Sequence, residues 1–295
     1  MSTEGGNAGI PFGASRPQLG IILCLLSMLV FAGQDSITKV LVRDLPVTQL
    51  LMMRYLAFTI FAVGYAACRG GVRISFRSKH RRLQVVRALV GILDMALFAY
   101  GLRFLGLAEM HALYAVFPLM TLALAGVMLG EAVGLRRWIA GGIGFAGTLV
   151  ILRPGAGVFE LAALIPLCSA LGFAFFNVLT RRISQHDSFA TNLLYMSCVG
   201  SVAVTFFALP GWVKPTASQW LLIGILSVSG IAAQLLLIQS LRYATAGTLQ
   251  PFNYALLVFA TVIGLVIFGE IPDTWTLVGA VLVIAGGLYS FKAKA

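Results

Sequence analysis

The chain has 295 residues, of which 59% are hydrophobic and only 11% are charged, and its formal net charge at pH 7 is +11. Soluble domains carry about 25% charged residues, so this composition excludes an ordinary soluble protein and makes the lipid bilayer the expected solvent. The basic residues stand in short gaps between apolar runs and form no stripe interleaved with aromatic side chains. Nucleic acid is therefore excluded as a partner.

Ten apolar runs follow a predicted disordered tail at residues 1–17, which has no apolar face. Each run is long enough, or nearly so, to cross a hydrocarbon core of roughly 30 Å. Lipid cannot satisfy free backbone amides and carbonyls, so the runs must be helices and the fold all-α. The runs cover residues 19–42, 47–68, 83–105, 108–130, 135–152, 158–180, 189–209, 219–243, 245–268 and 275–291.

Lys and Arg are distributed unevenly between the gaps that would face the two sides of the membrane. Alternate gaps place 14 basic residues on one side and 5 on the other. Cytoplasmic loops are enriched in Lys and Arg, so we expect a bacterial inner-membrane protein with both termini in the cytoplasm. Six of the 14 lie in the gap after the second run: Arg69, Arg73, Arg77, Lys79, Arg81 and Arg82.

The sequence contains one unit twice. Residues 100–152 align without a gap with residues 239–291, and a shift of 142 places Ser27 on Ser169 in the first and sixth runs. We therefore predict a five-helix repeat over 18–153 and a second over 154–295. Five is an odd number, so the copies cross the membrane in opposite directions. Inverted repeats of this kind are typical of alternating-access transporters.

Charged residues within apolar runs cost at least about 2.5–3.5 kcal/mol each, so each needs a reason. Asp35 and Arg54 lie at similar depths in the first two runs, and we expect them to form an ion pair that is either structural or a gate. Asp94 lies near the middle of the third run with no Lys or Arg within one turn. It is a candidate for proton coupling or amine binding, and the alternative is a neutral carboxyl hydrogen-bonded to a neighbouring helix.

Polar residues form a stripe on the fourth run, since His111, Tyr114, Pro118 and Thr121 share one helix face. Shifting this stripe by 139 places polar residues at the first two equivalent positions of the ninth run. Two inverted polar stripes suit a shared cavity, although interhelical hydrogen bonding would also explain them. We expect the cavity to be lined by Asp94, Phe98, His111, Tyr114, Phe117, Pro118, Thr121, Gln234, Gln239, Gln250, Asn253 and Leu257.

Enzymatic chemistry is not expected. The cysteines stand singly inside apolar runs and the histidines are scattered, so the sequence offers no metal site, no cofactor site and no catalytic constellation. Gly142-x-Gly144-x-x-Gly147 matches a dinucleotide-binding pattern, but it lies inside a spanning run rather than after a strand. We predict instead that these small residues allow close helix packing.

The chain resembles the drug/metabolite transporter superfamily, as an EamA-type protein, over residues 19–291, and is most similar to the YddG-type exporters of aromatic amino acids. That family usually has Trp where this chain has Phe31. The resemblance implies that helices 3, 4, 8 and 9 line a central cavity. It rests on Phe31-Ala32-Gly33, Lys39, Pro46 and Arg54 at the start of the repeat and on Gly130-Glu131 and Gly269-Glu270 at its end.

Cavity composition favours one class of substrate. The sugar phosphates and nucleotide sugars carried by other members of the superfamily need cationic side chains facing the cavity. Helices 4, 8 and 9 have no Lys or Arg away from their ends, and helix 3 has only Arg87, near its cytoplasmic end. We expect a small amphipathic solute with an amino group, most simply an exported aromatic or large apolar amino acid. Quaternary cations and a passive channel for small metabolites are the alternatives, and the oligomeric state stays open.

Overall fold

The structure is a computed structural model that describes residues 17–68, 71–129, 135–152, 161–184, 186–243, 249 and 252–292. Every regular element in these ranges is a helix, which confirms the predicted all-α fold. The predicted tail at residues 1–17 lies outside the described residues except for Pro17, where α1 begins. The helices are α1 (Pro17–Leu41), α2 (Val47–Cys68), α3 (Val72–Ser75), α4 (Arg81–Gly101), α5 (Leu107–Tyr114), α6 (Phe117–Leu129), α7 (Leu135–Leu152), α8 (Leu164–Ser184), α9 (Phe189–Ala208), α10 (Ala217–Tyr243), α12 (Ala255–Phe268) and α13 (Thr274–Lys292).

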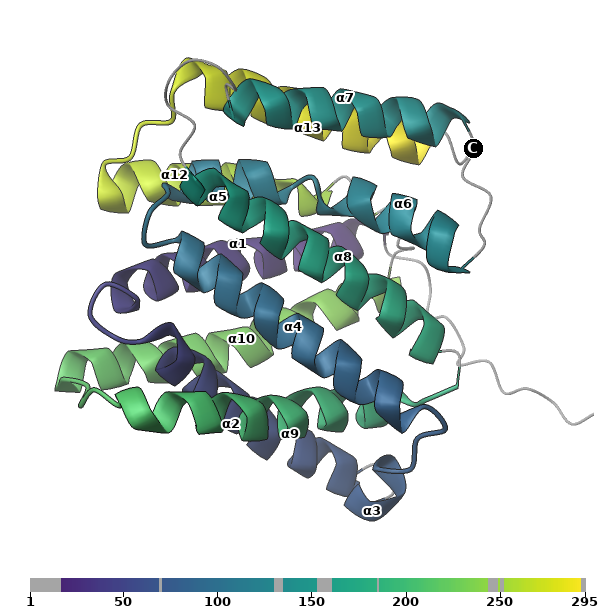
Figure 1. Ribbon diagram of the computed structural model, residues 1–295, viewed down its shortest axis with the longest axis vertical. Coiled ribbons are helices and arrows are strands. Elements are labelled where there is room, and N and C mark those ends of the chain that lie inside the picture. Colours follow the sequence, from purple (N-terminus) through teal and green to yellow (C-terminus); the bar gives the residue numbers. More distant parts are fainter. Residues whose placement is uncertain are drawn as a thin grey trace, which may run out of the picture.

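Seven helical segments in the described part of the chain are long and apolar enough to cross a membrane, and three shorter apolar helices accompany them. Together they correspond to the ten predicted runs. Figure 1 shows the helices crossing the molecule between two ends, with α3 and the end of α13 at the same end. We call this the α3 end, and the end that carries the α1–α2 and α12–α13 connections the opposite end.

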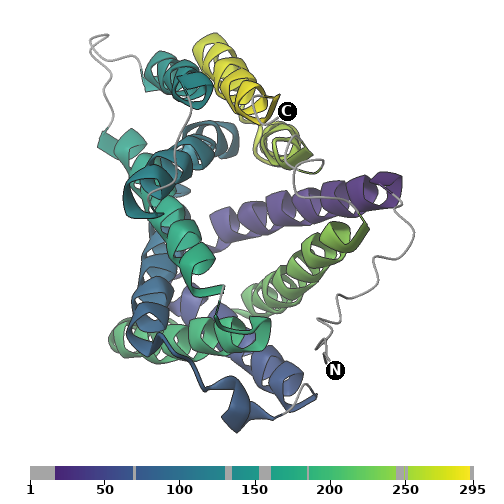
Figure 2. The ribbon, with the colours of Figure 1, turned by 90° about the vertical axis from the view of Figure 1, so that its right-hand side faces the viewer.

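Packing joins the two copies rather than separating them. Helix α1 packs on α10 and α12, and its counterpart α8 packs in the same way on α4 and α6. Two pairs consist of a helix and its own counterpart, namely α2 with α9 and α7 with α13. Figures 1 and 2 both show α7 and α13 side by side at one edge of the molecule. This arrangement is that of two inverted repeats sharing one body.

A matched pair of hydrogen bonds shows the internal pseudo-symmetry of the two copies at atomic scale. Ser27 Oγ donates to the Ala233 carbonyl over 2.8 Å, and Ser169 Oγ donates to the Asp94 carbonyl over 3.0 Å. Ser27 aligns with Ser169, and Asp94 aligns with Ala233 when the 139-residue shift is continued toward the N-terminus. The same buried bond therefore occurs twice. In one bond the serine belongs to the first copy, and in the other it belongs to the second.

The fourth predicted span is not one continuous helix. Helix α5 ends at Tyr114 and α6 begins at Phe117, with a turn between them. Pro118 lacks the amide that would bond the Tyr114 carbonyl, and this loosens the helix one turn before it. In the second copy, Tyr254 forms a turn at the position equivalent to Ala115, directly before α12. Both helices are therefore interrupted at the same depth.

Glycines bring α7 and α13 into close contact. A Cβ added to Gly147 would lie 2.7 Å from the Gly279 carbonyl oxygen, and one added to Gly279 would lie 2.6 Å from the Gly147 carbonyl oxygen. Real Cβ atoms do not approach backbone oxygens this closely, so both positions require glycine. The packing role predicted for the Gly142–Gly147 pattern is confirmed at Gly147, whereas Gly142 faces open space.

Candidate functional site

Asp94 is buried in the middle of α4, with 5% of its surface exposed. Ser169 Oγ on α8 lies 2.6 Å from Asp94 Oδ1, and the Tyr114 hydroxyl on α5 lies 3.4 and 3.5 Å from the two carboxylate oxygens. Among the described residues, no Lys or Arg forms an ion pair with this carboxyl. The Asp94 carboxyl therefore has hydroxyl groups from both copies as its partners, where a buried carboxylate would ordinarily have a Lys or an Arg.

Aromatic rings surround the same place. The Tyr114 ring lies edge-on to Phe98, with centroids 5.0 Å apart, and contacts Phe117 at 5.4 Å and Phe173 at 5.8 Å. Phe117 and Phe173 meet edge-on at 4.8 Å. The structure thus brings together four predicted residues, Asp94 included, and adds Phe173 and Ser169 of α8. The sequence analysis did not place these two at the site, although the 142-residue shift had already aligned Ser169 with Ser27.

The expected ion pair between Asp35 and Arg54 is not formed in this structure. Asp35 Oδ2 lies 3.1 Å from His111 Nε2 on α5, close enough for charge interaction although the N–H is not aimed at the oxygen. Arg54 Nη2 instead donates to Gln34 Oε1 over 3.3 Å. Neighbouring residues on a helix point about 100° apart, so Gln34 faces α2 while Asp35 faces α5. Sequence depth alone could not decide between them.

Buried donors without a protein partner lie around this group. They are Gln34 Nε2 and Arg54 Nε, and Gln34 is only 2% exposed. His111 Nε2 also makes no hydrogen bond, but the Asp35 carboxylate lies next to it. An unpartnered buried donor costs about 1–3 kcal/mol, which is expected where a ligand or water completes the bonding. We define the central site as Gln34, Asp35, Arg54, Asp94, Phe98, His111, Tyr114, Phe117, Ser169 and Phe173.

The other predicted cavity residues lie elsewhere or lack a described environment. Thr121 Oγ1 bonds the Phe117 carbonyl of its own helix over 2.8 Å, and Leu257 packs in the hydrophobic core. Asn253 Oδ1 accepts from Cys24 Sγ on α1 over 3.5 Å, next to the second helix break. Gln234 and Gln239 are exposed on α10. Gln250 and the side chain of Pro118 lie outside the described residues.

The opposite end of the bundle is held by a partly buried ion pair between Lys39 at the end of α1 and Glu270 between α12 and α13. Lys39 Nζ also donates to the Leu105 carbonyl over 2.9 Å, and Glu270 Oε2 accepts from the Leu107 amide over 2.8 Å. Glu270, which the sequence analysis used only as part of the resemblance, ties together α1, the start of α5 and the α12–α13 connection. Its counterpart Glu131 lies outside the described residues.

The α3 end is held by a network around the buried Arg87. Its guanidinium donates to the Asn192 carbonyl over 2.7 Å and to Gln84 Oε1 over 2.9 Å. Gln84 in turn donates to Asp187 Oδ2 over 2.9 Å. Burial acts to raise the pKa of Asp187, but hydrogen bonds from Ser78 and Gln84 prevail and lower it below its usual value. The network joins α4 to the start of α9.

These features define a class of protein. Two inverted five-helix copies, a pair of helices interrupted at equivalent positions and a buried carboxyl among aromatic rings are features of a membrane transporter built from repeats. The sequence model of the EamA-like transporter family matches residues 18–153 and again residues 160–291. The chain belongs to this family, which is one of transporters rather than enzymes.

Known relatives cover nearly the whole chain. The riboflavin transporter of Vibrio cholerae is 28% identical over 91% of each chain, and the S-adenosylmethionine uptake transporter of Rickettsia bellii is 27% identical over 92% of each. The pseudopaline exporter CntI of Pseudomonas aeruginosa is 22% identical over 93% of this chain and 96% of its own. A crystal structure at 19% identity superposes with a TM-score of 0.60 over 94% of this chain and 96% of its own, which supports the fold. These relatives are not named for aromatic amino acids.

Proposed function

We propose that this chain moves small amphipathic solutes that carry a positively charged amino group across the bacterial inner membrane, and that it exports aromatic and other large apolar amino acids. The observation that carries the proposal is the Asp94 carboxyl, buried beside the rings of Phe98, Tyr114, Phe117 and Phe173. A carboxylate among aromatic faces binds an ammonium group through both charge and cation–π attraction.

The central site offers a complement for each part of an amino acid. Asp94 suits the ammonium group and the ring cluster suits an aromatic side chain. The unpartnered donors of Gln34 and Arg54 suit the carboxylate, because charge-assisted hydrogen bonds are the stronger ones. A solute with all three parts would satisfy groups that the protein leaves unpaired.

The relatives widen the panel of solutes to be tested. Riboflavin and S-adenosylmethionine both contain a planar heteroaromatic ring, which could stack on the same side chains. Of the three relatives, one is named for uptake and one for export, so the direction of transport is itself part of the proposal. We keep export, which rests on the resemblance to amino-acid exporters, as the direction to be tested. We keep cytoplasmic termini because the basic residues gather on that side.

Transport by alternating access requires each end to open in turn. The Lys39–Glu270 pair joins three elements of both copies at the opposite end, so its separation would let α1 move away from the α12–α13 connection. The interrupted helices α5–α6 and α12 lie between the two ends and provide backbone that can rearrange at the site. Binding would bias this equilibrium by its differential affinity for the two states.

A second candidate is a carrier of lipophilic or quaternary cations. Asp94 and the rings favour it as much as they favour an amino acid, but such a solute would leave the donors of Gln34 and Arg54 unpaired. A quaternary dye and phenylalanine therefore separate the two. A passive channel is distinguished by unitary currents and by the absence of counter-transport.

Transport by the purified protein in liposomes tests the proposal. We expect saturable phenylalanine flux, stimulated by phenylalanine on the opposite side, with and without a pH gradient. Riboflavin, S-adenosylmethionine, a quaternary dye and a sugar phosphate complete the panel. If phenylalanine neither moves nor competes while another solute does, the amino-acid assignment is wrong. If unitary currents replace counter-transport, the carrier mechanism is wrong as well.

A further inference from the structure

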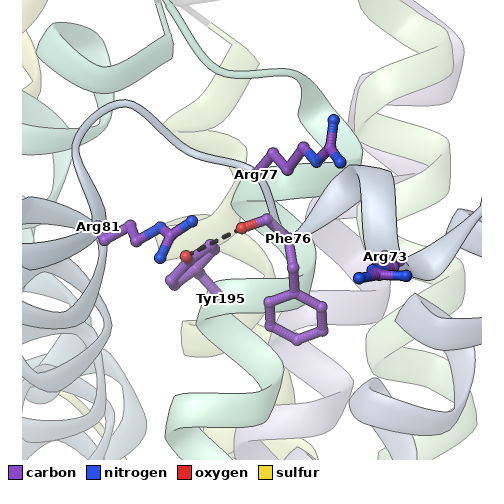
Figure 3. A pocket seen from close by; sticks show the side chains of 5 residues that line it. All are labelled: Arg73, Phe76, Arg77, Arg81 and Tyr195. Carbon is purple, nitrogen blue, oxygen red and sulfur yellow. Dashed lines mark hydrogen bonds between the residues drawn. The ribbon is translucent and has the colours of Figure 1, made fainter.

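Three arginines flank a hollow of about 400 Å³ at the α3 end of the bundle. The hollow is lined by Arg73, Phe76, Arg77, Arg81 and Tyr195. Figure 3 shows Arg73 and Arg81 on opposite sides of the Phe76–Tyr195 pair, with Arg77 above it in this view. The three guanidinium groups therefore border one shared space that is separate from the central site.

Specific contacts hold this segment against α9. The Tyr195 hydroxyl donates to the Phe76 carbonyl over 3.1 Å, and the two rings meet edge-on with centroids 5.6 Å apart. Gly71 has φ of 103°, a backbone conformation that favours glycine, where the chain turns from α2 into α3. These contacts fix the backbone that carries the three arginines against α9.

The hollow combines positive charge with exposed apolar surface. All three arginines are exposed, and within the described ranges none of them forms an ion pair with a carboxylate. Ile74 beside them is 63% exposed and Phe76 is 36% exposed. The segment connects α2 and α4, which are both long and apolar enough to cross a membrane, so we expect it at the membrane surface. Basic and apolar side chains together are what an interfacial segment presents to lipid.

We propose that this hollow binds the headgroup of an anionic phospholipid. The guanidinium groups would hold the phosphodiester oxygens, while Ile74 and Phe76 would contact the first carbons of the acyl chains. Three unpaired positive charges disfavour a zwitterionic headgroup, whose own ammonium would be repelled. A free phosphate would leave the apolar side chains in water. The proposal does not depend on which solute the central site carries.

The test compares short-chain phosphatidylglycerol with phosphatidylcholine of the same chain length. Each is titrated into the purified full-length protein, and the fraction of folded protein with bound lipid is measured by native mass spectrometry. We expect tighter binding of phosphatidylglycerol. The triple variant Arg73→Gln/Arg77→Gln/Arg81→Gln should weaken this binding by about a hundredfold, at about fivefold for each arginine.

A matched control removes the same charge at the same end. Lys79, Arg82 and Arg182 are exposed there but do not line the hollow, so Lys79→Gln/Arg82→Gln/Arg182→Gln should keep the preference for phosphatidylglycerol. If both triple variants lose it equally, diffuse charge attracts the lipid and the proposal is wrong. It is also wrong if the Arg73/Arg77/Arg81 variant retains the preference.

Two further measurements use the unmodified protein and do not depend on any variant folding. Raising the salt concentration from about 0.1 M to about 1 M shortens the screening length from about 10 Å to about 3 Å and should weaken phosphatidylglycerol binding more than phosphatidylcholine binding. Inorganic phosphate at the same free concentration should not displace the lipid. If phosphate displaces it efficiently, the hollow is a site for a soluble anion and the lipid assignment fails.

Discussion

The two copies of the repeat share a scaffold but differ in chemistry, as one pair of equivalent hydrogen bonds shows. Ser27 in the first copy and Ser169 in the second each bond a backbone carbonyl of the partner copy. The residue that owns the carbonyl is Ala233 in one case and Asp94 in the other. Only Asp94 adds a carboxyl, which Ser169 also contacts. Inversion therefore supplies the frame for alternating access, while single-copy substitutions supply the binding groups.

The largest effect is expected for Asp94→Asn. The substitution keeps the shape but removes the charge, and a hydrogen bond to a charged group is worth about 1.5–3 kcal/mol. Solute transport in liposomes should therefore fall by about 10- to 100-fold. Ser27→Ala, at the equivalent bond that carries no carboxyl, should leave transport nearly unchanged. Unchanged rate and pH dependence in Asp94→Asn would make the carboxyl structural.

The next effect concerns stability at the contact between α7 and α13. Gly147→Ala places a Cβ against the Gly279 carbonyl, and overpacking of this kind costs about 1–3 kcal/mol. Thermal unfolding in detergent should show a lower Tm than for wild type. Gly142→Ala, on the same helix with open space around it, serves as the control. Equal melting temperatures for the two variants would contradict the close approach.

A smaller effect is expected from the ring cluster. Phe173→Leu keeps an apolar side chain but loses the ring contacts with Tyr114 and Phe117, and aromatic pairs contribute about 0.5–1.5 kcal/mol beyond their buried area. We expect the KM for phenylalanine to rise about three- to tenfold. Phe31→Leu changes the residue that aligns with Phe173 in the first copy and should have less effect. If Phe31→Leu raises the KM for phenylalanine more than Phe173→Leu does, the proposal that Phe173 rather than its counterpart binds the solute is wrong.

The smallest effect concerns two equivalent acidic residues in the connections before α2 and α9. Asp187 accepts from Ser78 and Gln84, and these bonds lower its pKa despite its burial. A lowered folded-state pKa contributes stability that is present above the ordinary Asp value and is lost as the pH falls through the folded value. Asp187→Asn should flatten the fall of Tm below about pH 4. Asp44→Asn is the control. In the described part of the chain, the Asp44 carboxylate accepts a hydrogen bond only from Gln219, at the surface.

Much of the candidate site could be predicted from the sequence because depth in a membrane is a property of position along the chain. The middle of α4 and one face of α5 were identified in this way, and Asp94, Phe98, Tyr114 and Phe117 do meet. The partners of Asp94 could not be predicted, since Ser169 lies 75 residues away and nothing local shows which side of α8 faces α4. The predicted ion pair between Asp35 and Arg54 was wrong for the same reason, because nothing local shows which side of α1 faces α2.

The sequence by itself determined the helical class, the number of spans and the inversion of the copies, because hydropathy and the repeat follow chain order. Only the tertiary structure decided that Asp35 faces His111, that the fourth and ninth spans are interrupted, and that Lys39 reaches Glu270 over 231 residues. These outcomes depend on how each helix is rotated about its own axis. That rotation is set by packing against the other copy, which no single run of residues contains.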